Sequence, residues 1–458
     1  MELHERLSSS IPLDSAEADG RDPYTEVKNR IHLALVSELG PRLFGISDSD
    51  SIRARIEDEI RDQLGLEASL SGPDRERLRS EIASDIFGYG PLERLLADPT
   101  VSEIMINGPH QIWVERDGLL YETKLRFDDE SHLRRMINKM VGQVGRRIDE
   151  SSPMVDARLP DGSRVNAIIP PLSLTGPLLT IRKFSHERFT FEELARIGTL
   201  SDGAAEFLRL AVKGKLNILV SGGTGSGKTT LLNALSEALP DGDRIVTIED
   251  AAELRLLQRH VISLEARPMN IEGEGEITIR DLVRNALRMR PDRIIVGEVR
   301  GAEALDMMQA MNTGHEGSLS TVHANSPRDA LSRVETMILM AGFDLPVRAI
   351  RQYLSSALDL IVQLERLEDG TRQVTAITEV QRMEVDVITL QPLFEFKLER
   401  IDADGKVIGA LCPNPVRPSV LTKFERRGIE VPAFVFGAGL SPVADVEGIE
   451  WVEQAGAQ

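Results

Sequence analysis

The nine residues from Gly222 to Thr230, GGTGSGKTT, constrain this chain more than any other stretch. They fit the pattern G-x-x-x-x-G-K-[ST], and the apolar runs on either side predict a buried strand before the motif and a helix after it. In that setting, the backbone N–H groups of a glycine-rich turn and the positive end of the helix dipole face one anion-binding hollow. These flanks favour a phosphate-binding loop over a glycine-rich turn that binds nothing.

The loop also carries side chains that suit a nucleoside triphosphate. Lys228 would reach the β- and γ-phosphates, and the Thr229 hydroxyl would ligate Mg²⁺. We therefore predict binding of ATP with Mg²⁺. The residues expected to contact the nucleotide are Gly222, Gly223, Thr224, Gly225, Ser226, Gly227, Lys228, Thr229 and Thr230.

Composition narrows the class of protein. The net charge of −19 over 458 residues argues against a general nucleic-acid binder, which needs a basic face. The single cysteine, Cys412, excludes an internal disulfide and a four-cysteine zinc site. We find no signal-peptide pattern and no apolar run of about 18 residues. We expect a cytoplasmic protein that reaches a membrane only through partners.

The order of hydrophobic patterns predicts several parts. Residues 1–21 are polar and expected to be disordered, and three helical patterns follow within residues 22–87. Their narrow apolar faces fit either a bundle or docking on a partner. The later parts are an α+β domain at 88–185, a linker at 186–200, an α/β domain with a C-terminal subdomain at 201–436, and a mobile tail at 437–458.

The α/β region offers acids for hydrolysis at the ends of its predicted strands. Glu298 ends the apolar run IIVGE, but Gly297 stands where an aspartate metal ligand is common. Metal contact would then come through water or from Glu249 at the end of another strand. The acids Asp250 and Glu253 nearby are as well explained as helix-start residues.

A histidine closes a third strand. His323 would lie close to a γ-phosphate and could sense it by a hydrogen bond, although on spacing alone a structural role is favoured.

The motifs together resemble a known superfamily. The segments SGGTGSGKTTLLNAL, TIEDAAEL, RPDRIIVGEVRGAEAL, TGHEGSLSTVHANSPRDAL and DARLPDGSRVNAIIPP occur in the order of the type II/type IV secretion and type IV pilus ATPases. Residues 88–385 carry this resemblance, and the branch they resemble most is the CpaF-like ATPase of the tight-adherence (Flp) pilus. The absence of the four-cysteine loop found in several relatives agrees with that branch.

The resemblance implies a fold and an assembly. It implies a RecA-like P-loop NTPase domain of the α/β class with a mostly parallel sheet, preceded by a small PAS-like α+β domain and a helical module. Family members form ring-shaped homohexamers and act on an inner-membrane platform protein. We therefore expect an Mg²⁺-dependent ATPase motor for pilus assembly.

Residue roles also follow from the resemblance. Glu249, Asp250 and Glu253 fall in the family's Asp box, and Glu298 is its Walker B glutamate, for which a preceding glycine is normal. His315 and His323 fall in the His box, which raises the expectation that His323 meets the γ-phosphate. The basic residues that match family positions reaching nucleotide phosphates are Arg158, Arg164 and Arg182.

Three rival functions remain open. A type IV secretion ATPase for DNA or effector transfer shares most of these motifs. A nucleotide-gated scaffold would bind ATP and barely hydrolyse it. A DNA motor on the same core would need affinity for nucleic acid, and the charge of −19 predicts none.

Overall fold

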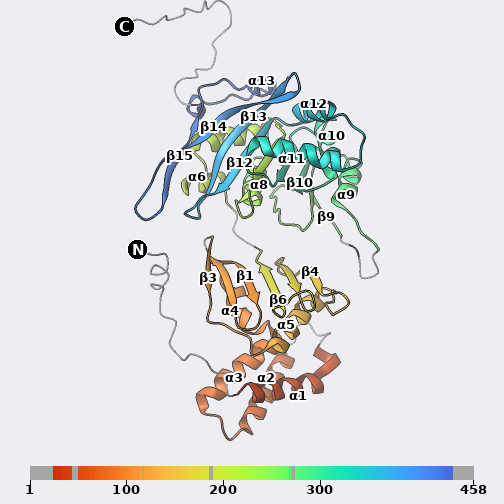
Figure 1. Ribbon diagram of the computed structural model, residues 1–458, viewed down its shortest axis with the longest axis vertical. Coiled ribbons are helices and arrows are strands. Elements are labelled where there is room, and N and C mark those ends of the chain that lie inside the picture. Colours follow the sequence, from red (N-terminus) through yellow and green to blue (C-terminus); the bar gives the residue numbers. More distant parts are fainter. Residues whose placement is uncertain are drawn as a thin grey trace, which may run out of the picture. The chain divides into compact units, whose positions relative to one another are not determined.

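The computed structural model describes residues 24–43, 50–116, 118–184, 189–267, 269 and 274–436. The chain divides into two compact units, Met1–Phe184 and Ser185–Gln458 (Figure 1). The predictions of a disordered N-terminus at 1–21 and a mobile tail at 437–458 lie outside the described residues.

Three helices form a bundle at the start of the first unit. They are α1 (Thr25–Leu43), α2 (Asp50–Gly65) and α3 (Gly72–Phe87). The Ser71 side chain caps α3 by accepting a hydrogen bond from the Asp74 backbone N–H. The helices therefore pack on one another, which was one of the two alternatives left open by the sequence. The residues of their shared core are Ile31, Leu35, Ile56, Ile60, Leu64, Leu70, Leu78 and Ile82.

A six-stranded antiparallel sheet with order β3-β2-β1-β6-β5-β4 completes the described part of this unit. Helix α5 buries its apolar side against one face of the sheet, around Ile104 and Val165. Strand β3 ends at Glu122, and Phe127 is buried in the core beyond it. The elements are η2 (Gly90–Leu92), α4 (Glu93–Ala97), β1 (Val101–Asn107), β2 (Ile112–Arg116), β3 (Leu119–Glu122), α5 (Glu130–Gln143), β4 (Met154–Arg158), β5 (Arg164–Ile168) and β6 (Leu178–Arg182).

A buried charge cluster joins the bundle to the sheet domain. The Lys28 Nζ of α1 lies 3.3 Å from Asp85 Oδ2 of α3 and 3.1 Å from Asp128 Oδ2. His132 of α5 contacts the same two carboxylates, with Nε2 3.2 Å from Asp85 Oδ1 and Nδ1 3.1 Å from Asp128 Oδ2. The regions 22–87 and 88–185 were expected as separate domains, but one compact unit, Met1–Phe184, holds the first and all but the last residue of the second.

The second unit is built on a nine-stranded sheet with order β15-β14-β13-β12-β7-β11-β10-β8-β9 in the described residues. The six strands from β12 to β9 in this order run parallel, and β13, β14 and β15 continue the sheet antiparallel. This is the expected α/β fold with a mostly parallel sheet. The strands are β7 (Ile218–Gly222), β8 (Ile245–Glu249), β9 (Val261–Glu265), β10 (Arg293–Val299), β11 (Leu319–Val322), β12 (Leu360–Arg366), β13 (Arg372–Glu384), β14 (Val387–Ile401) and β15 (Val407–Pro413).

Two hydrophobic cores cover the two faces of this sheet. One core includes α7 and α8, and the other includes α10, α11 and α12. No helix in the described part of the chain is long and apolar enough to cross a bilayer. The helices are α6 (Phe191–Arg196), α7 (Asp202–Lys213), α8 (Lys228–Glu237), α9 (Ile279–Ala286), α10 (Glu303–Asn312), α11 (Pro327–Met340), α12 (Val347–Ala357), α13 (Leu421–Glu425) and η3 (Ala433–Phe436).

One sequence prediction for this unit needs correction. The predicted linker at 186–200 contains α6, whose N-terminus carries a capping box between Thr190 and Glu193 and whose Phe191 and Leu194 are buried in the core. Strands β14 and β15 form an antiparallel hairpin that widens the main sheet, because β14 also pairs with β13.

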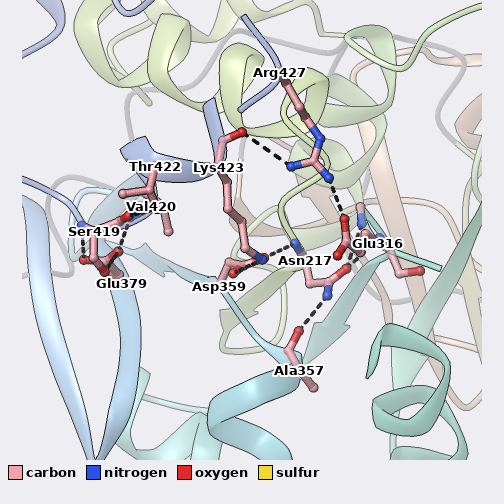
Figure 2. Close-up of polar contacts among 12 residues, drawn as sticks. Asn217, Glu316, Ala357, Asp359, Glu379, Ser419, Val420, Thr422, Lys423 and Arg427 are labelled. Atoms are coloured by element: carbon pink, nitrogen blue, oxygen red, sulfur yellow. Dashed lines mark hydrogen bonds and ion pairs between the residues drawn. The ribbon is translucent and has the colours of Figure 1, made fainter. Parts of the chain in front are cut away.

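Polar contacts fasten the C-terminal segment to the sheet (Figure 2). Lys423 of α13 donates to both carboxylate oxygens of Asp359, at 2.7 and 3.0 Å. The fully buried Glu379 accepts hydrogen bonds from the Ser419 hydroxyl and the Val420 backbone N–H, at 2.6 and 2.7 Å. Asp359 directly precedes β12, so these contacts hold α13 at the edge of the sheet where the parallel strands begin.

Candidate functional site

The phosphate loop lies between β7 and α8, on the opposite side of the sheet, where the parallel strands end. Every residue of β7 is buried, the strand ends at Gly222, and α8 begins at Lys228. Gly225 and Gly227 have φ of 68° and 95°, values that favour glycine. A Cβ on Gly222 would lie 2.5 Å from the Leu364 carbonyl oxygen, so a side chain there would clash with β12. The predicted loop conformation is therefore formed.

The loop is shaped to receive phosphates. The Lys228 Nζ donates to the carbonyl oxygens of Gly222 and Gly223, at 3.0 and 2.7 Å. Its ammonium thus lies at the first half of the loop, while Thr229 and Thr230 follow in the first turn of α8. Gly223, Thr224 and Ser226 border an open hollow. This cradle fits a polyphosphate, and the individual nucleotide contacts stay predictions.

Glu298 lies one residue before the end of β10 and is half-buried. The Arg300 Nη2 donates to its Oε2 at 2.8 Å, and the Arg300 Nη1 lies 3.6 Å from Asp250 Oδ2. Burial alone would raise the pKa of Glu298, but Arg300, Lys228 and His323 outweigh it and lower that pKa. The carboxylate is therefore ionised at neutral pH, within the electrostatic reach of the lysine of the phosphate loop.

Glu249 ends β8, the strand next to β10, and is only 3% exposed. Its Oε1 accepts hydrogen bonds from the backbone N–H groups of Glu253 and Leu254, at 2.8 and 3.0 Å. A Cβ on Gly297 would lie 2.9 Å from the Glu249 Cγ. The missing side chain at 297 thus makes room for Glu249, which explains physically why no aspartate precedes Glu298.

The two histidines of the predicted His box are separated. His323 directly follows β11, which lies between β7 and β10 in the sheet, so it shares one edge of the sheet with Lys228 and Glu298. Burial and then Lys228 lower the pKa of His323, so its ring is neutral at pH 7 and can donate or accept a hydrogen bond. His315 precedes β11 and lies at the opposite edge of the sheet. The structure therefore brings His323, and not His315, to the edge of the sheet that carries the phosphate loop.

The three predicted arginines of the first unit share one face of the six-stranded sheet. Arg158 of β4 lies directly opposite Arg164 of β5, which in turn lies opposite Arg182 of β6. Directly opposed side chains in an antiparallel sheet have Cβ atoms about 5 Å apart. Arg182 Nε is also 3.8 Å from Glu103 Oε1, which lies opposite it on β1. The structure therefore brings the three cations into one row, and their contact with a nucleotide stays a prediction.

Sequence reasoning missed several residues at the phosphate-loop edge. The Arg372 Nε of β13 donates to the Gly225 carbonyl oxygen at 2.9 Å, and Arg366 and Gln363 of β12 line the hollow beside the loop. No pattern pointed to them, because the pairing of β12 with β7 joins segments about 140 residues apart. Arg300 could have been found, since it directly follows β10 and lies two residues after Glu298.

Few side chains at the phosphate-loop edge of the sheet could bind a metal ion. Within the described ranges, no three acidic, histidine or cysteine side chains converge as a ready metal site. Glu249 and Glu298 nevertheless lie at the carboxyl ends of adjacent strands, and Thr229 lies in the first turn of α8. These oxygen donors suit Mg²⁺, which keeps several waters and binds substrate phosphates.

A glycine-rich strand–helix loop with acids at the ends of neighbouring parallel strands defines a P-loop nucleotide-binding domain. Residues 86–392 match the family described as Type II/IV secretion system protein, and the chain belongs to that family.

Two relatives and one solved structure are similar to this chain. The chain is 38% identical over 326 residues to the type IV secretion system protein PtlH of Bordetella pertussis, covering 65% of this chain and 93% of the relative. It is 34% identical over 331 residues to the type IV secretion system protein VirB11 of Bartonella quintana, covering 63% and 90%. Among solved structures, it is similar to the VirB11 ATPase of the Brucella suis type IV secretion system in complex with sulphate, with 32% identity, 63% and 94% coverage and a TM-score of 0.35.

Proposed function

We propose that this protein is an Mg²⁺-dependent ATPase motor that drives assembly of a tight-adherence (Flp) pilus through an inner-membrane platform. The observation that carries the ATPase is the strand order: the phosphate loop follows β7, His323 follows the neighbouring β11, and Glu298 lies near the end of the next strand, β10. Membership of the family supports a role in secretion or pilus assembly. The choice of the tight-adherence pilus depends on the sequence motifs.

Each residue of the site has a separate role in the proposed hydrolysis of ATP. The loop N–H groups bind the phosphates, and Lys228 exchanges its two carbonyl partners for the β- and γ-phosphates. Thr229 with Glu249 and Glu298 would hold Mg²⁺, which would neutralise phosphate charge when bound. Glu298 is ionised and orients the attacking water, while the neutral His323 donates a hydrogen bond to the γ-phosphate. The water oxygen bonds to the γ-phosphorus, the water gives a proton to the Glu298 carboxylate, and the bridging oxygen leaves with its electron pair on ADP.

The arginine row supplies the remaining positive charge. A row of three cations, of which Arg182 also lies near Glu103, attracts a polyanion. A triphosphate is such an anion, and Arg158, Arg164 and Arg182 would stabilise the transition state from the same subunit or from a neighbour.

We further propose that the working form is a homohexamer that binds no nucleic acid and meets the membrane only through its platform partner. The charge of −19 supports the absence of nucleic-acid binding. ATP hydrolysis in the second unit would change the orientation of that unit relative to the first unit, which carries the arginines. This movement would be transmitted to the platform protein.

Steady-state phosphate release tests the ATPase. Glu298→Gln should lower kcat by about 10²–10³-fold, because general-base assistance is worth that much, while binding of a non-hydrolysable ATP analogue is kept. Glu237→Gln, an exposed position at the end of α8, is the charge-matched control. Equally slow release by wild type and Glu298→Gln would instead identify a nucleotide-gated scaffold.

A type IV secretion ATPase is the second candidate, favoured by the similarity to PtlH and VirB11 proteins. Deletion of the gene separates the two. Loss of surface pili supports the pilus motor. Intact pili with loss of DNA or protein transfer supports the alternative.

A further inference from the structure

A pocket of about 280 Å³ lies beside the phosphate loop, within the second unit. It is several times larger than the share of one water molecule. Its lining joins the loop to the segment after β11 and to the end of β12. The lining residues are Gly223, Thr224, Ser226, Asn325, Gln363, Glu365 and Arg366.

One buried polar side chain that lines this pocket has an atom without a partner, and a second such side chain lies next to it on β7. Gln363 is 1% exposed, and its Nε2 donates to the Ala324 carbonyl oxygen at 3.3 Å. Its Oε1 has no hydrogen-bond partner among the residues that the structure describes. Ser221, directly paired with Gln363 on β7 and fully buried, likewise has a hydroxyl without a partner in the described chain. Buried polar atoms are normally hydrogen-bonded, so a polar guest is expected here.

The pocket borders the end of the loop at which the terminal phosphate is cleaved. The Lys228 ammonium, which takes the β- and γ-phosphates, lies 2.7 Å from the carbonyl oxygen of Gly223, a residue of the lining. Asn325, another lining residue, follows His323 by two positions. A γ-phosphate leaving the loop on this side enters the pocket directly.

The chemistry of the lining fits inorganic phosphate. The Arg366 guanidinium suits anionic oxygens, and the Gln363 Oε1 accepts from a hydroxyl. Inorganic phosphate at neutral pH carries both, whereas the terminal phosphate of bound ATP carries no hydroxyl. Glu365 is exposed at the rim of the pocket and accepts a hydrogen bond from the Thr375 hydroxyl at 2.9 Å. Its negative charge repels a bound anion and so shortens the time that phosphate remains in the pocket. We propose that this pocket is the exit site for product phosphate, an assignment that rests on the proposed ATP hydrolysis.

Binding of inorganic phosphate to the full chain saturated with Mg²⁺–ADP tests the assignment without turnover. Titration calorimetry should show that Arg366→Gln weakens phosphate binding by about tenfold, because a charge-assisted hydrogen bond is lost. Glu365→Gln should tighten it severalfold, since a repelling charge is removed. Arg382→Gln and Glu368→Gln, exposed and outside the pocket lining, are the matched controls.

Sulfate provides a test of Gln363, because it carries no hydroxyl at neutral pH. The wild type should bind phosphate more tightly than sulfate, and Gln363→Met should bind the two ions equally. The proposal is overturned if phosphate affinity is the same in all variants and controls. It is equally overturned if Arg366→Gln weakens ADP as much as phosphate, because Arg366 would then serve the nucleotide. Failure of the wild type to hydrolyse ATP would contradict the proposed function, while this titration still decides what the pocket binds.

Discussion

At the scale of single residues, Gly297 decides whether the two acids of the site can coexist. A methyl group at this position would lie 2.9 Å from the Glu249 Cγ, closer than such carbons approach. We predict that Gly297→Ala displaces Glu249 and lowers kcat by about tenfold, because misplaced catalytic groups lose at least that much. Phosphate release and ATP-analogue binding measure the two effects separately. Gly242→Ala, in open space, is the control and should change neither.

The buried cluster around His132 makes the first unit sensitive to pH. Burial alone would lower the pKa of His132, but hydrogen bonds to Asp128 and Asp85 outweigh it and raise that pKa. The stabilisation is therefore complete below the ordinary pKa of 6.5 and is lost as the pH rises through the raised value. For Asp128, burial opposes ionisation, but His132 and Lys28 lower its pKa to about 2. The contribution of Asp128 to stability is therefore present above pH 3.8 and is lost as the pH falls towards about 2.

We predict that His132→Gln reduces the loss of unfolding free energy that the wild type shows as the pH rises. Urea unfolding followed by Trp113 fluorescence at about pH 6 and pH 9 measures this decline. His110→Gln replaces an exposed histidine of the same unit and should leave it unchanged. A wild type equally stable at both pH values would show that the cluster makes no net contribution.

At the scale of elements, α13 depends on the Lys423–Asp359 ion pair. Asp359 is 11% exposed in its side chain and Lys423 is 34% exposed, so the pair is partly screened. We predict that Lys423→Met destabilises the second unit by about 1–3 kcal/mol, because it leaves a buried carboxylate without its cation. Asp359→Asn combined with Lys423→Met should cost less than the sum of the single changes. Additive losses in denaturant unfolding would contradict a coupled pair.

Elements with strong local signals were predictable from the sequence. The strand before Gly222, the helix after it and the strands ending at Glu249 and Glu298 follow from apolar runs and glycine positions. Helix α6 was missed because only six residues carry its pattern, and burial of Phe191 decides its structure. The contacts of Arg366 and Arg372 with the loop depend on long-range strand pairing, which no local pattern records.

At the scale of the whole molecule, the two units have separate cores. We predict that residues 24–184 and 189–436, produced separately, each fold and unfold cooperatively. The second fragment should bind an ATP analogue but hydrolyse ATP at least about 10²-fold more slowly than the full chain, because the arginine row is absent. Calorimetry and phosphate release check the two statements. Full activity in the isolated second fragment would remove Arg158, Arg164 and Arg182 from the mechanism.

The tight fit of Gly297 against Glu249 also limits how this site can change over time. An aspartate ligand at 297 and a glutamate at 249 compete for the same space between β10 and β8. A chain with this sheet can therefore adopt one arrangement of acids or the other, but passes through a crowded form if 297 changes first. The uncrowded route loses the side chain at 249 before one is gained at 297, and the reverse change loses 297 first, so the geometry of two neighbouring strands fixes the order of the substitutions.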